Sequence, residues 1–264
     1  MTEATRAPSA ARTADPGDSA APALELRSVS AGYGASAVLH DISITVPRSS
    51  VVALLGPNGA GKTTTLRVAA GLLRPARGAV LIGGREAGRS APFRRARQGV
   101  CLIPEGRGIF RSLTVRENLE LLIPPWRKDK SIDPAVEAFP ILGQRLGQAA
   151  GLMSGGQQQQ LALARAFLSA PDVVLLDEVS MGLAPVIVDQ IFESLKLLAA
   201  TGVALVLVEQ YVSRALEMAD TAYLMARGAI AWSGPAATLD TNAITRAYLG
   251  HADEVPTASP GRTD

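Results

Sequence analysis

A glycine-rich segment that ends in a lysine and two threonines has the residue types best suited to chemistry. It runs from Gly56 to Thr64, follows the apolar run VVALL and precedes a helical pattern. Glycines let backbone N–H groups approach phosphate oxygens, the lysine adds a positive charge, and a threonine hydroxyl binds Mg²⁺. We therefore predict a phosphate-binding loop for a nucleotide. Its residues are Gly56, Pro57, Asn58, Gly59, Ala60, Gly61, Lys62, Thr63 and Thr64.

Two adjacent carboxylates, Asp177 and Glu178, end the apolar run VVLLDE. A carboxylate at such a strand end can hold Mg²⁺ or its water shell. A second carboxylate beside it can orient or deprotonate an attacking water. An acid pair at a strand end is often merely solvated, but beside a phosphate loop it predicts nucleotide hydrolysis.

A second candidate anion site lies at Ser154–Gln157, where MSGGQ opens a long helical pattern. Ser154 is a good N-cap, and Gly155 and Gly156 leave backbone N–H groups bare at the positive end of the helix. Taken alone, this is an ordinary capped helix. In a chain with one phosphate loop, a second such site implies either two nucleotides or a dimer.

The elements that must position these residues follow an alternating order. Short strand-like runs alternate with helical ones, which predicts an α/β fold with a parallel core sheet. The expected strands are 37–46, 51–55, 173–177 and 204–208, and the expected helices are 62–70, 155–169 and 185–200.

The remaining segments differ in composition. Residues 1–23 and 251–264 are predicted to be disordered tails around a domain at 24–250. The segment from about 92 to 152 is richer in Arg, Pro and Gly and is predicted to be a mainly helical insert. Within it, Cys101 is expected to be a small core residue. The cluster Arg94, Arg95 and Arg97 is expected to form a solvated helix face, with contact to lipid headgroups or a membrane partner as the alternative.

Composition limits the function classes. The chain has 26 Lys and Arg against 24 Asp and Glu, a net charge of +2 that gives no sign of nucleic-acid binding. Its single cysteine cannot form an intramolecular disulfide and fits a reducing compartment. No apolar run approaches the roughly 20 residues of a membrane helix, and the first residues show no signal sequence. We expect a soluble chain whose membrane role comes through partners.

Together these motifs resemble the ABC ATPase family over nearly all of 24–250. The resemblance implies a P-loop core with an N-terminal antiparallel β subdomain and a helical insert carrying the signature Ser154–Gln157. It also implies ATP with Mg²⁺, and two subunits packed head to tail so that each ATP lies between one phosphate loop and the other signature. Nothing in it implies nucleic acid.

Further site residues come from the same resemblance. Tyr33 matches the aromatic residue that stacks on adenine. Glu105 stands where most members have the glutamine that senses Mg²⁺, and it joins Thr63 and Asp177 as expected metal-site residues. Gln210 stands where most have a histidine that contacts the γ-phosphate, and it joins Glu178 as an expected catalytic residue.

The histidine replacement has two interpretations. The chain has 2 histidines, at positions 40 and 251, and neither is placed for that contact. Either Gln210 supplies a neutral hydrogen bond, or the site hydrolyses ATP slowly. Ala184 also replaces the usual aspartate, Val179 the usual proline, and Arg111 a proline.

The motifs PEGRGIFRSLTVRENL, DEVSMGLAPVIVDQIF and LVLVEQ resemble one subgroup, the second ATPase subunit of branched-chain amino-acid importers. The subgroup implies a second ATPase subunit, permease subunits, an extracytoplasmic solute-binding protein and a place on the cytoplasmic face of the membrane. The resemblance leaves open the exact solute and whether the dimer is a homo- or heterodimer.

Two other function classes remain open. A soluble ABC ATPase acting on ribosomes or DNA usually has two cassettes or a coiled-coil insert, and neither is found here. A regulatory partner with little hydrolysis is disfavoured by Glu178 but not excluded, because of Gln210.

The stretch Glu105–Arg116 is predicted to dock a short cytoplasmic helix of the permease. Ile109, Phe110 and Leu113 offer apolar surface there, with glycines that let the loop move. The alternative is that Phe110 fills the core of the insert.

Overall fold

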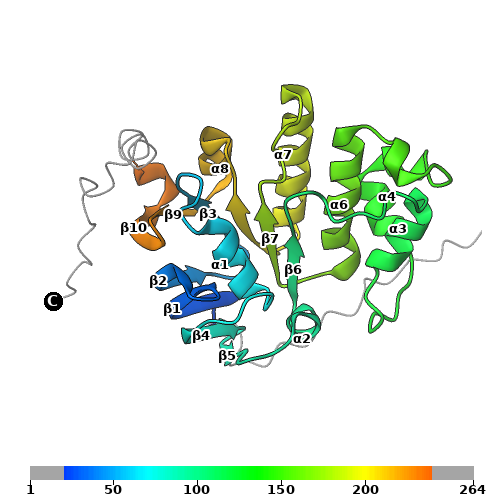
Figure 1. The fold of residues 1–264 in the computed structure, drawn as a ribbon. Coiled ribbons are helices and arrows are strands. Elements are labelled where there is room, and N and C mark those ends of the chain that lie inside the picture. The colour runs from blue at the N-terminus through cyan, green and yellow to red at the C-terminus, as the bar shows by residue number, and fades with distance from the viewer. Residues whose placement is uncertain (1–20, 240–264) are drawn as a thin grey trace, which may run out of the picture.

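The computed structural model describes residues 21–239, which form two sheets and a set of helices (Figure 1). The smaller sheet has the strand order β2-β1-β4-β5 with antiparallel pairing. Along β2 buried and exposed residues largely alternate, as expected for a sheet with one face on a core. Its strands are β1 (Leu24–Tyr33), β2 (Ser36–Val46), β4 (Arg77–Ile82) and β5 (Arg85–Glu86).

The larger sheet has the order β10-β9-β3-β8-β7-β6 and is parallel except for the β9–β10 hairpin. Every residue of β3, β7 and β8 is buried, which explains their continuous apolar sequences. These strands are β3 (Val51–Leu55), β6 (Val100–Ile103), β7 (Val173–Asp177), β8 (Ala204–Val208), β9 (Thr221–Ala226) and β10 (Ala229–Pro235).

The helices divide between three apolar cores. The first lies between the two sheets and includes apolar residues of α1. The second lies between the large sheet and the helices α3, α6 and α7, and the third packs α8 against β3 and β9. The α-helices are α1 (Lys62–Ala69), α2 (Pro92–Arg97), α3 (Val115–Leu122), α4 (Asp133–Ala138), α5 (Pro140–Gly143), α6 (Gly155–Ser169), α7 (Pro185–Ala200) and α8 (Val212–Met218), with 3-10 turns η1 (Ala150–Leu152) and η2 (Ala236–Thr238).

The α/β fold with an antiparallel subdomain is confirmed, and so are the predicted bounds of β3, β7, β8, α6 and α7. The predicted start of the insert is corrected. Strand β6 falls inside 92–152 but pairs in parallel with β7 in the core sheet, so the helical region begins at Val115. Cys101, on β6, is buried as predicted.

Of the two predicted domain boundaries, only the one at residues 23 and 24 lies within the described residues. Ala23, the last residue assigned to the first tail, is buried and its N–H donates to the carbonyl of Val46 at 2.9 Å. Residues 1–20 and 240–264 lie outside the described residues. None of the helices between 21 and 239 is both long and apolar enough to cross a membrane.

The basic cluster on α2 is not uniformly solvated, which corrects the sequence interpretation. Arg94 and Arg97 are exposed, but Arg95 is 2% exposed. Its guanidinium donates to the carbonyls of Val68 at 2.5 Å and Ala69 at 2.8 Å. Those are the last carbonyls of α1, which have no partner within the helix. Arg95 therefore caps the helix that follows the phosphate loop.

Candidate active site

The phosphate loop joins the buried strand β3 to α1, and its glycines are required by its geometry. Gly56 and Gly61 have φ of 142° and 107°, a region that side chains rarely adopt. A Cβ on Gly56 would lie 2.3 Å from the carbonyl oxygen of Met225, and one on Gly61 would lie 2.7 Å from Leu39 Cδ2. The loop can therefore approach a ligand closely with its backbone, and the N-terminus of α1 follows it directly.

Lys62 is the first residue of α1, and it is 6% exposed. Its Nζ donates to the carbonyls of Gly56 at 2.7 Å and Pro57 at 3.1 Å. Burial lowers the pKa of Lys62, while the carboxylates of Glu178 and Asp177 oppose that shift. The ammonium is thus held in place where a triphosphate would lie along the loop.

Thr63 and Asp177 have the geometry of neighbouring magnesium ligands. The Thr63 hydroxyl donates to Asp177 Oδ1 at 3.0 Å. Two adjacent oxygen ligands of an octahedral Mg²⁺ lie about 3.0 Å apart, given bonds of about 2.1 Å. Burial raises the pKa of Asp177, Thr63 opposes this, and Glu178 and Glu105 raise it further. A divalent cation would offset this concentration of negative charge, so the residues present fit Mg²⁺.

Glu178 follows β7 in a strained backbone conformation, with φ of 49°. Its N–H donates to the carbonyl of Val208 at 2.8 Å, at the end of the neighbouring strand β8. Gln210 Nε2 then donates to Glu178 Oε2 at 3.0 Å. The two residues predicted to be catalytic therefore meet, although they are far apart in the sequence.

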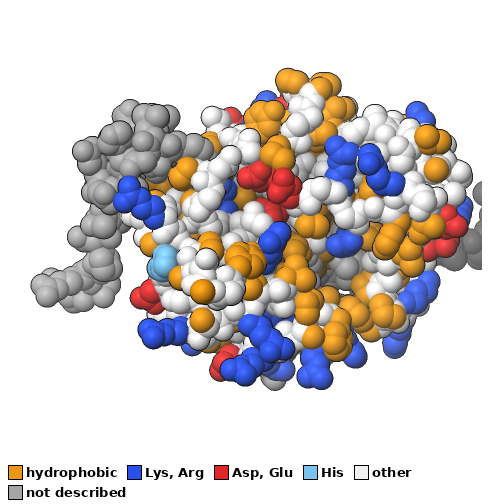
Figure 2. Space-filling view, viewed as in Figure 1, with side chains coloured by type: hydrophobic (Ala, Val, Ile, Leu, Met, Phe, Trp, Pro, Cys, Tyr) orange, Lys and Arg blue, Asp and Glu red, His pale blue; other side chains and the backbone are white. Residues whose placement is uncertain are grey.

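Lys62, Thr63, Glu178 and Gln210 line one open cavity of about 530 Å³, whereas Asp177 is not in its lining. Glu105 reaches it from the segment after β6, and Figure 2 shows acidic side chains gathered near the centre of this face. The lining residues are Val38, Asn58, Gly59, Gly61, Lys62, Thr63, Thr64, Glu105, Glu178, Met181 and Gln210.

Tyr33 lies beside α1 rather than in the lining of that cavity. Its hydroxyl accepts a hydrogen bond from Arg67 Nη1 at 3.1 Å, and its side chain is exposed. An exposed ring next to the phosphate loop is available for stacking, so its predicted role stays a prediction.

The signature Ser154–Gln157 is likewise not among the described residues that line the cavity. It forms a capping box: the Gln157 N–H donates to Ser154 Oγ at 3.3 Å, and the Ser154 N–H donates to Gln157 Oε1 at 3.1 Å. The start of α6 is thus built as predicted, but this chain alone does not bring it to the phosphate loop.

Glu209 and Ser180 were not identified individually from the sequence as residues of the site. Both are buried, and Ser180 donates from its hydroxyl and its backbone N–H to the Glu209 carboxylate. Glu209 was read only as part of the motif LVLVEQ. A carboxylate directly after an apolar strand and before a catalytic residue was the available signal.

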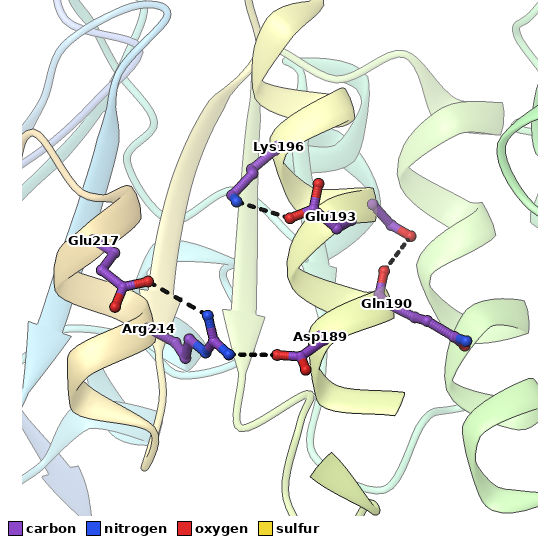
Figure 3. A network of polar contacts seen from close by, with 7 residues as sticks. Asp189, Gln190, Glu193, Lys196, Arg214 and Glu217 are labelled. Atoms are coloured by element: carbon purple, nitrogen blue, oxygen red, sulfur yellow. Dashed lines mark hydrogen bonds and ion pairs between the residues drawn. The ribbon is translucent and has the colours of Figure 1, made fainter. Parts of the chain in front are cut away.

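The helices that follow Glu178 and Gln210 are also connected (Figure 3). Arg214 on α8 contacts Asp189 on α7 at 2.6 Å and Glu217 on its own helix at 3.6 Å. Lys196 and Glu193 pair along α7 at 2.8 Å. These pairs are well exposed, so each adds little stability.

A family model described as ABC transporter matches residues 39–181. The chain belongs to this ABC transporter family. It is 42% identical over 231 residues to the high-affinity branched-chain amino acid transport ATP-binding protein BraG of Pseudomonas aeruginosa, covering 86% of this chain and 99% of BraG. It is 37% identical to the probable branched-chain amino acid transport ATP-binding protein LivF of Archaeoglobus fulgidus, covering 79% and 90% of the two chains.

Other members of the ABC transporter family are also similar. The lipopolysaccharide export system ATP-binding protein LptB of Haemophilus influenzae is 33% identical, with 86% of this chain and 97% of LptB covered. A solved ATP-binding subunit of an ABC transporter matches at 29% identity and TM-score 0.69, covering 80% and 89% of the two chains. A nucleotide-free ATP-binding cassette at 24% identity and TM-score 0.74 supports the fold alone. The chain is an ATP-binding subunit of an ABC transporter and an ATPase.

Proposed function

We propose that this ATPase subunit drives the import of branched-chain or related amino acids. The observation that carries the proposal is the 42% identity to BraG over 99% of that protein. LivF, at 37%, points the same way, whereas LptB is 33% identical. Gln210 lies in the motif LVLVEQ, which resembles the same subgroup, and its Nε2 donates to Glu178 Oε2 at 3.0 Å.

In the proposed mechanism the triphosphate lies along Gly56–Thr64 with Lys62 beside its β- and γ-phosphates. Thr63 and Asp177 would hold Mg²⁺, with Glu105 near its water shell. The ion would supply positive charge against the phosphate oxygens. Glu178 orients and deprotonates the attacking water, and Gln210 fixes its carboxylate.

The second half of the proposed site belongs to another subunit. Ser154 is exposed at the start of α6, and none of the residues 154–157 lines the cavity of their own chain. In a head-to-tail pair this terminus would meet the γ-phosphate in the partner's loop, where its N–H groups and dipole favour an anion. Tyr33 would stack on the adenine of its own ATP.

An apolar groove of about 500 Å³ is the proposed docking site for a short helix of a permease subunit. Phe93, Leu121 and Trp126 line it and are 59%, 60% and 41% exposed. Figure 2 shows hydrophobic side chains over α2, β6 and α3, with Lys and Arg along the lower margin. Phe110, predicted to dock that helix, is 56% exposed and so does not fill the insert core, but it does not line the groove.

Docking there would hold the subunit at the cytoplasmic face of the membrane. The permease would in turn receive solute from an extracytoplasmic binding protein.

Uptake in cells tests the transport proposal. Deleting the gene should abolish uptake of labelled leucine, isoleucine or valine at low concentration. The wild-type gene should restore it, and the K62A gene should not. If uptake of all three is unchanged in the deletion strain while uptake of another solute fails, the amino-acid assignment is wrong and the ATPase assignment stands.

A further inference from the structure

Glu209 is a buried carboxylate between β8 and Gln210. It is 1% exposed. Burial raises the pKa of Glu209 to about 7, while hydrogen bonds from Ser180 and the Gln210 backbone oppose that shift. Within the described chain, no cation is among the groups that act on this pKa. A buried carboxyl without a counterion costs stability, so packing alone does not explain its presence.

Both oxygens of this carboxylate are used by Ser180. The Ser180 hydroxyl donates to Oε2, and the Ser180 N–H donates to Oε1 at 3.2 Å. Ser180 is completely buried and lies two residues after Glu178. The paired contacts fix the position and the orientation of the Ser180 backbone, as in other bidentate pairs.

The contact joins the two segments that carry the catalytic residues. One segment contains Glu178 and Ser180, and the other contains Glu209 and Gln210. The Glu178 N–H also bonds the carbonyl of Val208, and Gln210 bonds the Glu178 side chain. Glu178 has a left-handed backbone that persists only where its surroundings enforce it. The Ser180–Glu209 pair supplies that enforcement from the C-terminal side.

We propose that Glu209 is a positioning residue that acts through Ser180 to hold Glu178 and Gln210 as one rigid unit. The proposal rests on ATP hydrolysis by this site and does not depend on the transported solute. Glu209 itself touches neither ATP nor water in this role. Losing the pair lets the 178–181 segment shift, and small displacements of a catalytic group lower turnover strongly.

The test uses the full-length chain, with its partner subunit where turnover requires one. The variants are E209A, which removes both hydrogen bonds to Ser180, S180A and the double variant. E193Q on α7 is the matched control, because Glu193 is an exposed glutamate away from the cavity. The measurements are ATP affinity by calorimetry, kcat and KM for Mg-ATP, and the melting temperature of each protein.

Positioning predicts that E209A and S180A each lower kcat by about tenfold or more. Because the phosphate loop is untouched, KM and ATP affinity should stay within about twofold of wild type. The double variant should lose no more than the more impaired single variant, since one contact is removed in all three. E193Q should behave as wild type.

Two outcomes overturn the proposal. One is folded E209A and S180A with kcat within about twofold of wild type. The other is loss of ATP affinity and melting temperature in proportion to kcat, which is the mark of a purely structural residue. If E209A does not fold, S180A decides, because it removes only one hydroxyl. A wild-type protein that hydrolyses ATP without driving amino-acid uptake would refute the transport proposal and leave this one standing.

Discussion

Lys62 shows how one side chain determines nucleotide binding. Its ammonium is buried, and two loop carbonyls hold it in position beside the proposed phosphate site. Replacing Lys62 with Ala should weaken ATP binding by about a hundredfold or more, because charge-assisted bonds to two phosphates are lost. Calorimetric titration measures this, with K196A as the exposed-lysine control. Unchanged affinity in K62A would refute the assignment of the loop.

Glu209 gives stability a pH dependence whose sign follows from its raised pKa. The folded protein holds the proton up to about pH 7, whereas an unfolded glutamate releases it near 4.5. The neutral form is therefore favoured in the fold, and its contribution is lost as pH rises through that window. Relative to E209Q, the wild type should lose on the order of 3 kcal/mol of unfolding free energy between pH 4.5 and 8.

Urea unfolding of both proteins at a series of pH values measures this difference, since other titrating groups are common to the two. A difference that is constant with pH would mean that Glu209 ionises normally in the fold.

At the scale of elements, α2 has two faces with separate roles. Arg95 points inward and caps α1, while Phe93 lines the apolar groove beside Trp126. Figure 2 shows this region as part of the lower edge of the face that carries the cavity. The groove therefore lies close to α1, the helix that follows the phosphate loop. A permease helix docked in the groove would contact residues next to α1.

Phe93→Ala should uncouple transport without damaging the subunit. The side chain is 59% exposed, so stability should change by no more than about 0.5 kcal/mol. ATP binding should survive, while solute-stimulated turnover in the reconstituted transporter should fall by about tenfold, as loss of a central aromatic contact predicts. Phe110→Ala is the matched variant, because that ring is equally exposed but outside the groove, and its effect should be smaller. A larger effect at Phe110 would move the docking site to the Glu105–Arg116 loop, as the sequence predicted.

At the scale of the whole molecule, the proposed pair of subunits places the signature of one chain at the open cavity of the other. Glu178→Gln keeps the side-chain shape but removes the base, so ATP should bind without being hydrolysed. The variant should form a persistent dimer with ATP, alone if the pair is a homodimer and with the second ATPase subunit if it is not. Light scattering after size-exclusion chromatography measures the mass.

Two controls identify the interface in that experiment. K62A/E178Q should stay monomeric because ATP is not bound, and S154R/E178Q should stay monomeric because a bulky cation blocks the start of α6. Turnover of E178Q at the wild-type rate would refute the role of Glu178. A dimer that persists in S154R/E178Q would place the contact elsewhere.

The sequence by itself determined the local elements and the nature of the ligand. Buried parallel strands require continuous apolar runs, and phosphate loops require glycines at positive φ, so β3, β7, β8 and the loop residues could be located from residue order alone. The start of helix α6 was predictable because Ser154 caps it locally. These features depend on neighbours in sequence.

Only the tertiary structure decided which distant residues meet. Strand β6 is short and its neighbours are Arg- and Gly-rich, so its membership of the core sheet depends on pairing with β7 rather than on composition. Arg95 looked solvated because its partners, the last carbonyls of α1, lie on another element. The Glu209–Ser180 pair and the groove are also formed by segments far apart in the sequence, so local sequence patterns do not predict them.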